Sequence, residues 1–401
     1  MFCDKEIIVI NMKNKINETQ ELKDVCMRFV GCRSDGYLAL GLGVSARGGE
    51  ILSKWGKTLC VIDKTVLKFG LHKPFLASLE EKNVSYEIFD EVEAEPDIET
   101  MERAYKRALG DGIRAVVGMG GGSVLDTAKA VALALGSGIS VLRLFEKIDA
   151  AKESLPLVLM PTTSGTGSEV SPYSVASKNG KKIFIGDSKL YARVALVDPL
   201  LTVSMPPKVT AATGMDALSH AVEGMMSASN PVTFAYGCES VKLIFKYLSA
   251  AVKDGNDLRA RYYMSFASVL GMLSYAQGGG LYAHSVSYIL TEMLSLPHGV
   301  GCGLALPYCV NLNKEYISDV TDAICSALNI SSDASVLAKK LRDLQGAVGL
   351  PTNLKAAGVK EEELEKFSKK LIDDYYRPKN PRQVNGETAL KFIKAMYEEQ
   401  L

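Results

Sequence analysis

The change in hydrophobic pattern near Pro206-Pro207 divides the sequence into two parts. Before it, short β-branched runs alternate with helical stretches, and strands are predicted over residues 58–63, 85–90, 113–119, 155–160 and 194–198. Such alternation is typical of a parallel sheet with helices on both faces. After it, apolar residues recur every three or four positions. We therefore predict an α/β domain over 1–205 and an all-helical domain over 206–401, with a cleft between them.

The composition excludes several classes of protein. The 46 basic and 46 acidic side chains cancel, so the chain lacks the positive field that attracts nucleic acid or an anionic membrane. No apolar run approaches the roughly 18 residues of a membrane span, and residues 1–15 lack a signal-peptide pattern. Eight cysteines contain no Cys-x-x-Cys pair. We expect reduced thiols and a cytoplasmic protein.

A run of glycines lies between a predicted strand and a predicted helix. Gly120, Gly121 and Gly122 precede Ser123, and a helical pattern follows. Without Cβ atoms the backbone can approach a phosphate closely, and the amides and dipole of a helix N-terminus favour the anion. The Gly-x-Gly-x-x-Gly pattern is not present here, and a tight turn is the alternative interpretation. Three glycines exceed what a turn needs, so we favour phosphate binding.

Two further features favour a nucleotide. The segment 160–170 follows a predicted strand and carries five hydroxyl side chains, at the sheet edge where ligands bind in such folds. Asp63 ends the predicted strand over 58–63. A carboxylate there can accept hydrogen bonds from a ribose and repel a 2′-phosphate, which favours NAD over NADP. An N-cap for the next helix is an equally good interpretation of Asp63.

Three of the four histidines form a candidate metal site with one aspartate. Asp216 and His220 are four residues apart, so they share one face of a predicted helix and can reach one cation. His284 and His298 would complete the set. Oxygen and nitrogen donors without thiolate suit Fe(II), Zn(II), Ni(II) or Mn(II). The alternative is a surface pair with two unrelated histidines, and His72 is expected at the surface.

The site requires a break in the chain between its last two histidines. His284 and His298 are fourteen residues apart and would lie about 21 Å from each other on one straight helix. Pro297 and Gly299 indicate that the helix is interrupted. A turn between Leu294 and Pro297 would bring the two rings together.

In this order, the motifs resemble those of the iron-containing (group III) alcohol dehydrogenases. The family pattern Gly-Gly-Gly-Ser-x-x-Asp-x-x-Lys matches residues 120–129, and Pro-Thr-Thr-x-Gly-Thr-x-x-Glu matches 161–169. Family motifs also match within 198–223 and at 297–299, and the likeness spans roughly residues 40–310. It implies that the four candidate ligands bind a metal, Fe(II) first and Zn(II) or Mn(II) otherwise. It also implies a two-domain fold with an α/β nucleotide-binding domain.

The resemblance implies how NAD(H) would bind. Gly122 and Ser123 would hold the pyrophosphate, and Asp63 would face the adenosine ribose. The cofactor-binding residues expected in all are Asp63, Gly120, Gly121, Gly122, Ser123, Asp126, Thr162, Thr163, Thr166 and Lys182. Lys181 is the alternative to Lys182. Because family members are commonly dimers, we expect a homodimer or a larger homo-oligomer.

The sequence departs from the family at one position near the nicotinamide. A second histidine often follows the third ligand by four residues, and here that position is Tyr288. Tyr288 would either relay a proton or shape the pocket by packing, and packing is favoured. By the same resemblance, Tyr173, Tyr275, Tyr376 and Arg377 fall near the substrate pocket.

The function expected is a metal-dependent, NAD(H)-linked alcohol dehydrogenase or aldehyde reductase acting on a short-chain substrate. Arg377 or Lys379 is hypothesised to meet a carboxylate or sulfonate on that substrate; a solvated basic loop is the favoured alternative. A glycerol-dehydrogenase-like or dehydroquinate-synthase-like enzyme of the same fold is a further alternative. So is a nucleotide-independent metallohydrolase, and a non-catalytic binding protein is disfavoured by the complete ligand set.

Overall fold

The computed structural model describes residues 25–28, 36–93 and 95–401. The chain forms two compact units. The first comprises Met1–Thr163, Ser168–Met205 and Asp254–Ser265, and the second comprises Ser164–Gly167, Pro206–Lys253 and Phe266–Leu401. The signal-peptide interpretation, Cys3 and Cys32 lie outside the described residues. Within these residues no helix is long and apolar enough to cross a bilayer.

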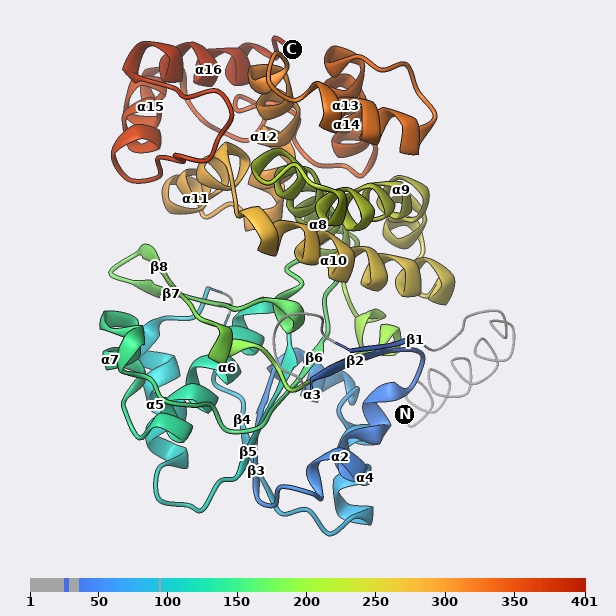
Figure 1. Cartoon of the computed structure of the whole chain (residues 1–401), viewed down its shortest axis with the longest axis vertical. Coiled ribbons are helices and arrows are strands. Elements are labelled where there is room, and N and C mark those ends of the chain that lie inside the picture. Colours follow the sequence, from blue (N-terminus) through green and yellow to red (C-terminus); the bar gives the residue numbers. More distant parts are fainter. Residues whose placement is uncertain (1–24, 29–35, 94) are drawn as a thin grey trace, which may run out of the picture. The chain divides into compact units, whose positions relative to one another are not determined.

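A seven-stranded sheet forms the centre of the first unit, in the order β1-β2-β9-β6-β5-β3-β4 (Figure 1). Its strands are β1 (Val25–Arg28), β2 (Tyr37–Leu40), β3 (Thr58–Ile62), β4 (Tyr86–Phe89), β5 (Ala115–Gly120), β6 (Leu157–Pro161) and β9 (Val194–Val197). Strands β2, β9, β6, β5, β3 and β4 are parallel, and β1 is antiparallel at one edge. The predicted parallel sheet is confirmed. The central strands β3, β5 and β6 are almost entirely apolar and fully buried, as expected of strands covered on both faces.

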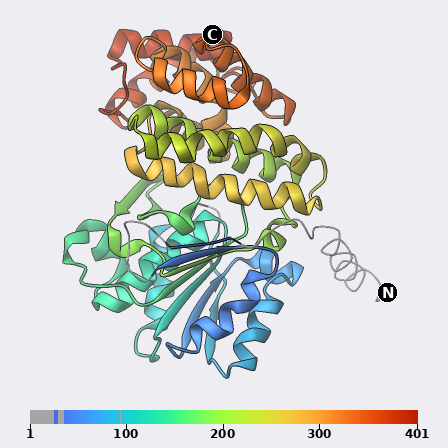
Figure 2. The same ribbon diagram turned by 45° about the vertical axis from the view of Figure 1, so that its right-hand side comes forward.

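Helices cover both faces of this sheet, as Figures 1 and 2 show. The helices are α2 (Gly48–Leu52), α3 (Lys64–Phe69), α4 (Lys73–Glu81), α5 (Ile98–Ala108), α6 (Gly122–Ser137) and α7 (Val141–Glu146). On β3, Leu59 and Val61 pack with α5 and α6. Cys60 and Ile62 alternate with them and pack with α2 and α4 on the other face. The period of two residues therefore places a core on each side.

Two elements of this unit differ from the predicted pattern. The helical pattern after β3 forms two helices, α3 and α4, because Gly70 adopts a left-handed φ of 71° at the C-cap of α3. A hairpin of β7 (Tyr173–Lys178) and β8 (Lys181–Gly186) was not predicted. Its turn is Asn179-Gly180, with φ of 52° and 74°, the turn chemistry that two-residue hairpins require.

The second unit is helical throughout (Figure 2). Its helices are α8 (Pro207–Ser227), α9 (Pro231–Lys253), part of α10 (Leu258–Gly278), α11 (Tyr282–Leu294), α12 (His298–Asn313), α13 (Ser318–Leu328), α14 (Ala334–Ala347), α15 (Leu364–Asp373) and α16 (Gly386–Glu398). Together, the parallel sheet with helices and the helical region confirm the predicted fold class. Helices α8, α11 and α12 pack against one another, and they carry the candidate metal ligands.

Candidate active site

Several of the predicted nucleotide-binding positions lie at the carboxyl edge of the sheet. Strand β5 lies between β3 and β6, with Ile62 paired to Met119 and Gly120 paired to Pro161. Asp63 and Thr162 directly follow β3 and β6, and their amides donate to Met119 O at 3.0 Å and Gly120 O at 2.9 Å. The carboxyl ends of parallel strands are where such sheets bind ligands.

The glycine loop begins α6 without a side-chain cap. Gly121 is the N-cap residue in an extended conformation, and no side chain accepts from the first turn at this position. A Cβ on Gly121 would lie 3.5 Å from the Thr163 methyl group, whereas one on Gly120 would lie 2.6 Å from Val124. Gly120 is thus required by packing, and Gly121 leaves backbone open to an anion.

Asp63 is the N-cap of α3, which is one of the two roles predicted for it. Its side chain accepts a hydrogen bond from Thr65 N at 2.6 Å and caps α3. The carboxylate is half-exposed at the sheet edge. One of its oxygens is used by the cap, so the position is compatible with a ribose contact as well.

Lys182 on β8 is connected to the glycine loop through Glu95. The two side chains form an ion pair, and Glu95 N donates to Ser123 Oγ at 3.2 Å. Glu95 holds a left-handed φ of 60°, a conformation that costs energy for a residue with a side chain and often marks a functional segment. Lys181, the alternative, is exposed at the start of β8.

Asp126 lies below the loop, within the protein. It accepts from Ser168 Oγ at 2.5 Å and from Val175 N at 3.0 Å. Burial raises its pKa despite the neighbouring charge of Lys129. Lys129 is fully buried and donates to Ser168, to Ser171 and to the Tyr173 carbonyl. Asp126 and Lys129 therefore fix the segments around the nucleotide edge.

The helical unit brings the four candidate ligands to one point. Asp216 Oδ1 lies 3.9 Å from His220 Nε2, 4.0 Å from His284 Nε2 and 3.7 Å from His298 Nε2. Ligands around a tetrahedral ion at about 2.0–2.2 Å lie roughly 3.4 Å apart. The three separations from Asp216 Oδ1 are slightly longer than this value. The ligand atoms of Asp216, His284 and His298 lie within 4.8 Å of one another, in a group that includes Cys302 and does not include His220. The structure contains the turn that this requires: α11 ends at Leu294 and α12 begins at His298.

Each imidazole is held through its other nitrogen. His220 Nδ1 lies 3.3 Å from the Gly165 carbonyl, and His284 Nδ1 lies 2.5 Å from Glu223 Oε2. Ser287 Oγ donates to the His298 carbonyl, so it accepts from His298 Nδ1 at 2.7 Å. These contacts place the proton on each Nδ1 and the lone pair of each Nε2 toward Asp216. Such partners orient histidines that bind metals.

The electrostatics of the cluster call for a cation. Asp216 Oδ1 and His284 Nε2 are buried without a hydrogen-bond partner, and buried polar atoms are rarely left so. Burial and the nearby His220 hold the pKa of His284 well below its usual value, so its imidazole is neutral. Burial raises the pKa of Asp216, but the three imidazoles together outweigh it, and the net pKa is lowered. A neutral imidazole and a carboxylate that face each other fit a bound metal.

Aromatic rings surround the cluster. Tyr275 lies edge-on to His220 with centroids 4.7 Å apart, and Tyr288 stacks on His298 at 5.1 Å. Burial raises the pKa of Tyr288 to about 12. Tyr375 was not predicted from the sequence; its ring centroid lies 5.4 Å from that of Tyr288.

Arg377 packs over one ring of this aromatic layer, that of Tyr288. Its guanidinium carbon is 5.7 Å from the Tyr288 centroid, and Nε donates to Ser285 Oγ at 2.8 Å. Burial alone would lower its pKa, but Tyr288, Tyr275 and Glu223 raise it, so the side chain stays charged. Lys379 is exposed and donates to the Gly278 carbonyl.

Tyr376, between α15 and α16, is 45% exposed and donates to Gln383. Tyr173 belongs to the sheet unit, at the start of β7. Thr166 belongs to the helical unit, unlike Thr162 and Thr163. His72, expected at the surface, is part-buried at the start of α4.

Four residues that touch the candidate ligands were missed from the sequence. Glu223 follows His220 by three residues on α8, and it also accepts from Leu281 N and Ala283 N, which begin α11. Cys302 follows His298 by four residues, the same spacing as Asp216 and His220, and could have been found by it. Ser287 and Gly165 carry no comparable signal, because they contact the ligands only through the tertiary fold.

Comparison with known proteins places this geometry among enzymes. The family model "Iron-containing alcohol dehydrogenase" matches residues 38–199, and "Fe-containing alcohol dehydrogenase family, C-terminal" matches residues 210–397. The long-chain-alcohol dehydrogenase 1 of Geobacillus thermodenitrificans is 35% identical over 325 residues, covering 78% of this chain and 82% of the relative.

Two sulfoacetaldehyde reductases are also similar. That of Bilophila wadsworthia is 29% identical over 378 residues, which cover 89% of this chain and 96% of the relative. The crystal structure of the Bifidobacterium kashiwanohense enzyme, in complex with NAD+, has a TM-score of 0.82 and 27% identity. It covers 92% of this chain and 99% of that chain.

Proposed function

Starting from the fact that the chain belongs to the iron-containing alcohol dehydrogenase family, we propose that it reduces short aldehydes that carry an anionic group. The activity that family membership establishes is NAD(H)-linked oxidoreduction between an alcohol and its aldehyde, with a divalent metal. The specificity for substrates with a sulfonate or carboxylate group is proposed in addition to this activity. A nucleotide-independent metallohydrolase is set aside by this membership.

The convergence of three imidazole lone pairs on one carboxylate oxygen carries the assignment of the reaction centre. We propose that Asp216, His220, His284 and His298 hold the metal, with separations of 3.7–4.0 Å as support. When bound, the metal polarises the substrate oxygen, and NAD(H) supplies or accepts the hydride. The four side chains position that oxygen and exclude water from it, because all but His298 are at least 95% buried.

The sheet edge would hold the cofactor. The uncapped amides at Gly121 to Ser123 suit the pyrophosphate, and Asp63 suits a ribose hydroxyl and disfavours a 2′-phosphate. Thr162 and Thr163 follow the neighbouring strand. This arrangement supports NAD(H) over NADP(H).

Tyr288 is proposed to orient His298 rather than to transfer a proton. Its ring is stacked on that imidazole with an interplanar angle of 18°. With a pKa of about 12 it keeps its proton through the neutral range. A general acid–base would need a pKa nearer to the working pH.

Arg377 is the basis for the anionic substrate. It is a permanently charged guanidinium, separated from the ligand His298 by the single ring of Tyr288. Its planar fork can bind a carboxylate or sulfonate through two hydrogen bonds. Two similar proteins are named sulfoacetaldehyde reductases. A substrate with a sulfonate group close to its aldehyde agrees with a guanidinium placed near the candidate metal ligands. The alternative of a fully solvated basic loop predicts that Arg377 is as exposed as Lys379. Instead, Arg377 is partly buried and Lys379 is exposed.

The test compares NADH oxidation with sulfoacetaldehyde, a carboxylated aldehyde of similar length, and propionaldehyde. A charge-assisted hydrogen bond contributes about 1.5–3 kcal/mol, so Arg377→Ala should lower kcat/KM on the two anions by roughly 10- to 100-fold. On propionaldehyde the loss should be below about threefold. Lys379→Ala, on the same loop, serves as the matched control and should behave as the wild type. Equal losses on charged and neutral aldehydes, or no loss, would remove the anion hypothesis.

A further inference from the structure

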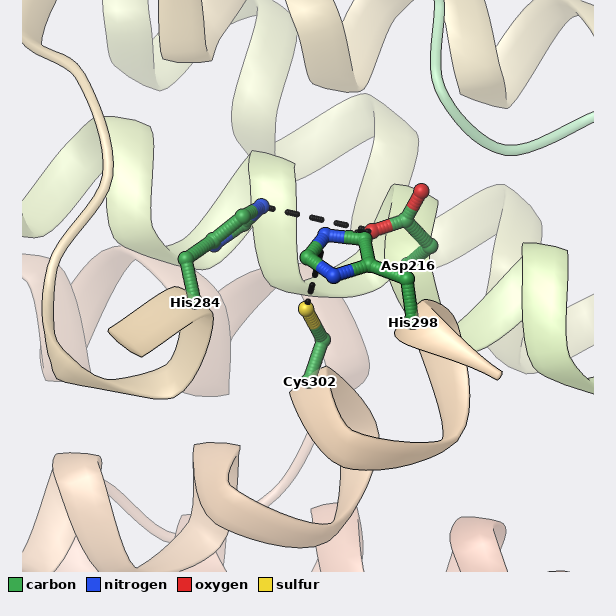
Figure 3. Close-up of side chains that lie close together, drawn as sticks. All are labelled: Asp216, His284, His298 and Cys302. Atoms are coloured by element: carbon green, nitrogen blue, oxygen red, sulfur yellow. Dashed lines mark hydrogen bonds and ion pairs between the residues drawn. The ribbon is translucent and has the colours of Figure 1, made fainter. Parts of the chain in front are cut away.

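A thiol stands beside the candidate metal ligands. Cys302 lies one turn after His298 on α12 and is completely buried. Its Sγ is 3.4 Å from His298 Nε2, the nitrogen that faces Asp216. Figure 3 shows Cys302 and the imidazoles pointing into one space from two different helices.

The thiol belongs to the cluster by geometry. The ligand atoms of Asp216, His284, His298 and Cys302 all lie within 4.8 Å of one another. Two atoms in this group, Asp216 Oδ1 and His284 Nε2, are buried and have no hydrogen-bond partner. At metal–nitrogen distances of about 2.0–2.1 Å and metal–sulfur distances of about 2.3 Å, neighbouring nitrogen and sulfur ligands lie roughly 3.1–3.6 Å apart. The distance of 3.4 Å between Cys302 Sγ and His298 Nε2 falls in this range.

We propose that Cys302 supplies a sulfur ligand to the metal held by Asp216, His284 and His298. The inference rests on the metal-binding part of the proposed function. It adds a sulfur donor to a set of ligands that otherwise bind through nitrogen and oxygen. As the metal–sulfur bond forms, the S–H bond breaks and its proton leaves to solvent.

The chemical consequence is a preference among metals. Thiolate is a soft ligand that favours Zn(II) and Co(II) over Mn(II), which is better suited to carboxylate and water oxygens. Loss of the sulfur should therefore weaken Zn(II) binding more than Mn(II) binding. His220 remains on α8, at 3.9 Å from Asp216 Oδ1, and stays a ligand in this account.

Cobalt spectroscopy tests the bond directly, with no dependence on activity. The full-length protein is stripped of metal and titrated with Co(II) under anaerobic conditions. The wild type should show the near-ultraviolet sulfur-to-cobalt charge-transfer band together with visible ligand-field bands. Cys302→Ala should keep the visible bands and lose the charge-transfer band. Cys309→Ala changes another fully buried cysteine of α12 outside the cluster, so it should resemble the wild type.

Two results would overturn the proposal: visible bands without a charge-transfer band in the wild type, or a charge-transfer band that persists in Cys302→Ala. If Cys302→Ala fails to fold, Cys302→Ser serves instead, because its hydroxyl keeps a polar group at the site. A competition with a chelating dye gives a second readout. The ratio of Zn(II) to Mn(II) affinity should fall at least about tenfold in Cys302→Ser, and an unchanged ratio would contradict sulfur ligation.

The outcome separates this proposal from the proposed function. Cobalt bound without sulfur, with aldehyde reduction intact, removes Cys302 as a ligand and leaves the reductase assignment standing. Absence of any cobalt binding in the wild type would remove both, because the cluster itself would then not hold a metal.

Discussion

The cluster around Asp216 and the loop at 120–123 are proposed to bind their ligands through different atoms. In the cluster, side chains would bind the metal, and each imidazole is oriented by a contact on its Nδ1. In the loop, the backbone would bind the cofactor, and the absence of Cβ atoms at the start of α6 leaves it accessible. Substitutions in the cluster should therefore act by removing a metal-binding atom. Substitutions in the loop should act by adding a Cβ atom that hinders the approach of the cofactor.

The largest effect should come from removing a candidate ligand. Asp216→Ala or His284→Ala takes one donor from a buried set and leaves the others facing an empty space. A Lewis acid contributes several kcal/mol to the reaction, so kcat should fall roughly a thousandfold or more. NADH binding, followed by fluorescence, should stay within about threefold of the wild type. Full activity in either variant would contradict the metal assignment.

A smaller loss should follow from changing what orients a ligand. Glu223 accepts hydrogen bonds from His284 Nδ1 and from two backbone amides. In Glu223→Gln the side-chain NH2 group would face one or more of these N–H donors, so at least one of the hydrogen bonds would be lost. Such changes typically reduce metal affinity 10- to 100-fold. The measurement is Zn(II) competition with a chelating dye. Glu239→Gln on α9, an exposed carboxylate paired with Lys242, is the control. Equal affinities in the two variants would show that the contact is dispensable.

The glycine loop offers a pair of adjacent substitutions with opposite outcomes. A Cβ on Gly121 meets only ordinary contacts, so Gly121→Ala should fold normally and weaken NADH about tenfold by narrowing the approach of the pyrophosphate. A Cβ on Gly120 lies 2.6 Å from Val124, so Gly120→Ala should cost about 1–3 kcal/mol of stability. NADH fluorescence and thermal unfolding separate the two. Loss of stability in Gly121→Ala, without loss of affinity, would contradict the backbone role.

The smallest effect concerns pH. Burial raises the pKa of Glu169, on the segment after β6, to about 7 from 4.5. Because the folded protein then binds this proton more tightly than the unfolded chain, the resulting stabilisation is complete below about pH 4.5. It is lost as the pH rises through 7. Between pH 6 and 7 the loss should be about 1 kcal/mol, and Glu169→Gln should not show it. Urea unfolding of both proteins at the two pH values measures the difference; parallel pH dependence would refute the shift.

The fold class could be predicted from the sequence because strand and helix periods differ, so the patterns before and after Pro206 indicate two architectures. The candidate metal set could be proposed because Asp216 and His220 lie one turn apart on α8, and Pro297 directly precedes α12. The dipeptide Asn179-Gly180 is a typical hairpin turn, from which β7 and β8 could also have been predicted.

Other parts of the site follow only from the tertiary fold. Glu223, Ser287 and the Gly165 carbonyl orient imidazoles from other segments of the chain, and no local pattern links them to those rings. The same holds for Tyr375, whose neighbour Tyr376 was predicted in the pocket but is turned toward Gln383. Side-chain direction on a loop depends on long-range packing that spacing does not encode.

Metal reconstitution decides whether the Asp216 cluster is a catalytic metal site. Stripped protein is titrated anaerobically with Fe(II), Zn(II) or Mn(II), and metal content is measured beside NADH oxidation with the aldehyde panel. We expect one ion per chain, no turnover in its absence, and turnover with NADH in preference to NADPH when the ion is restored. Turnover by the fully stripped protein, or no ion bound at the Asp216 cluster, would refute the proposed metal site.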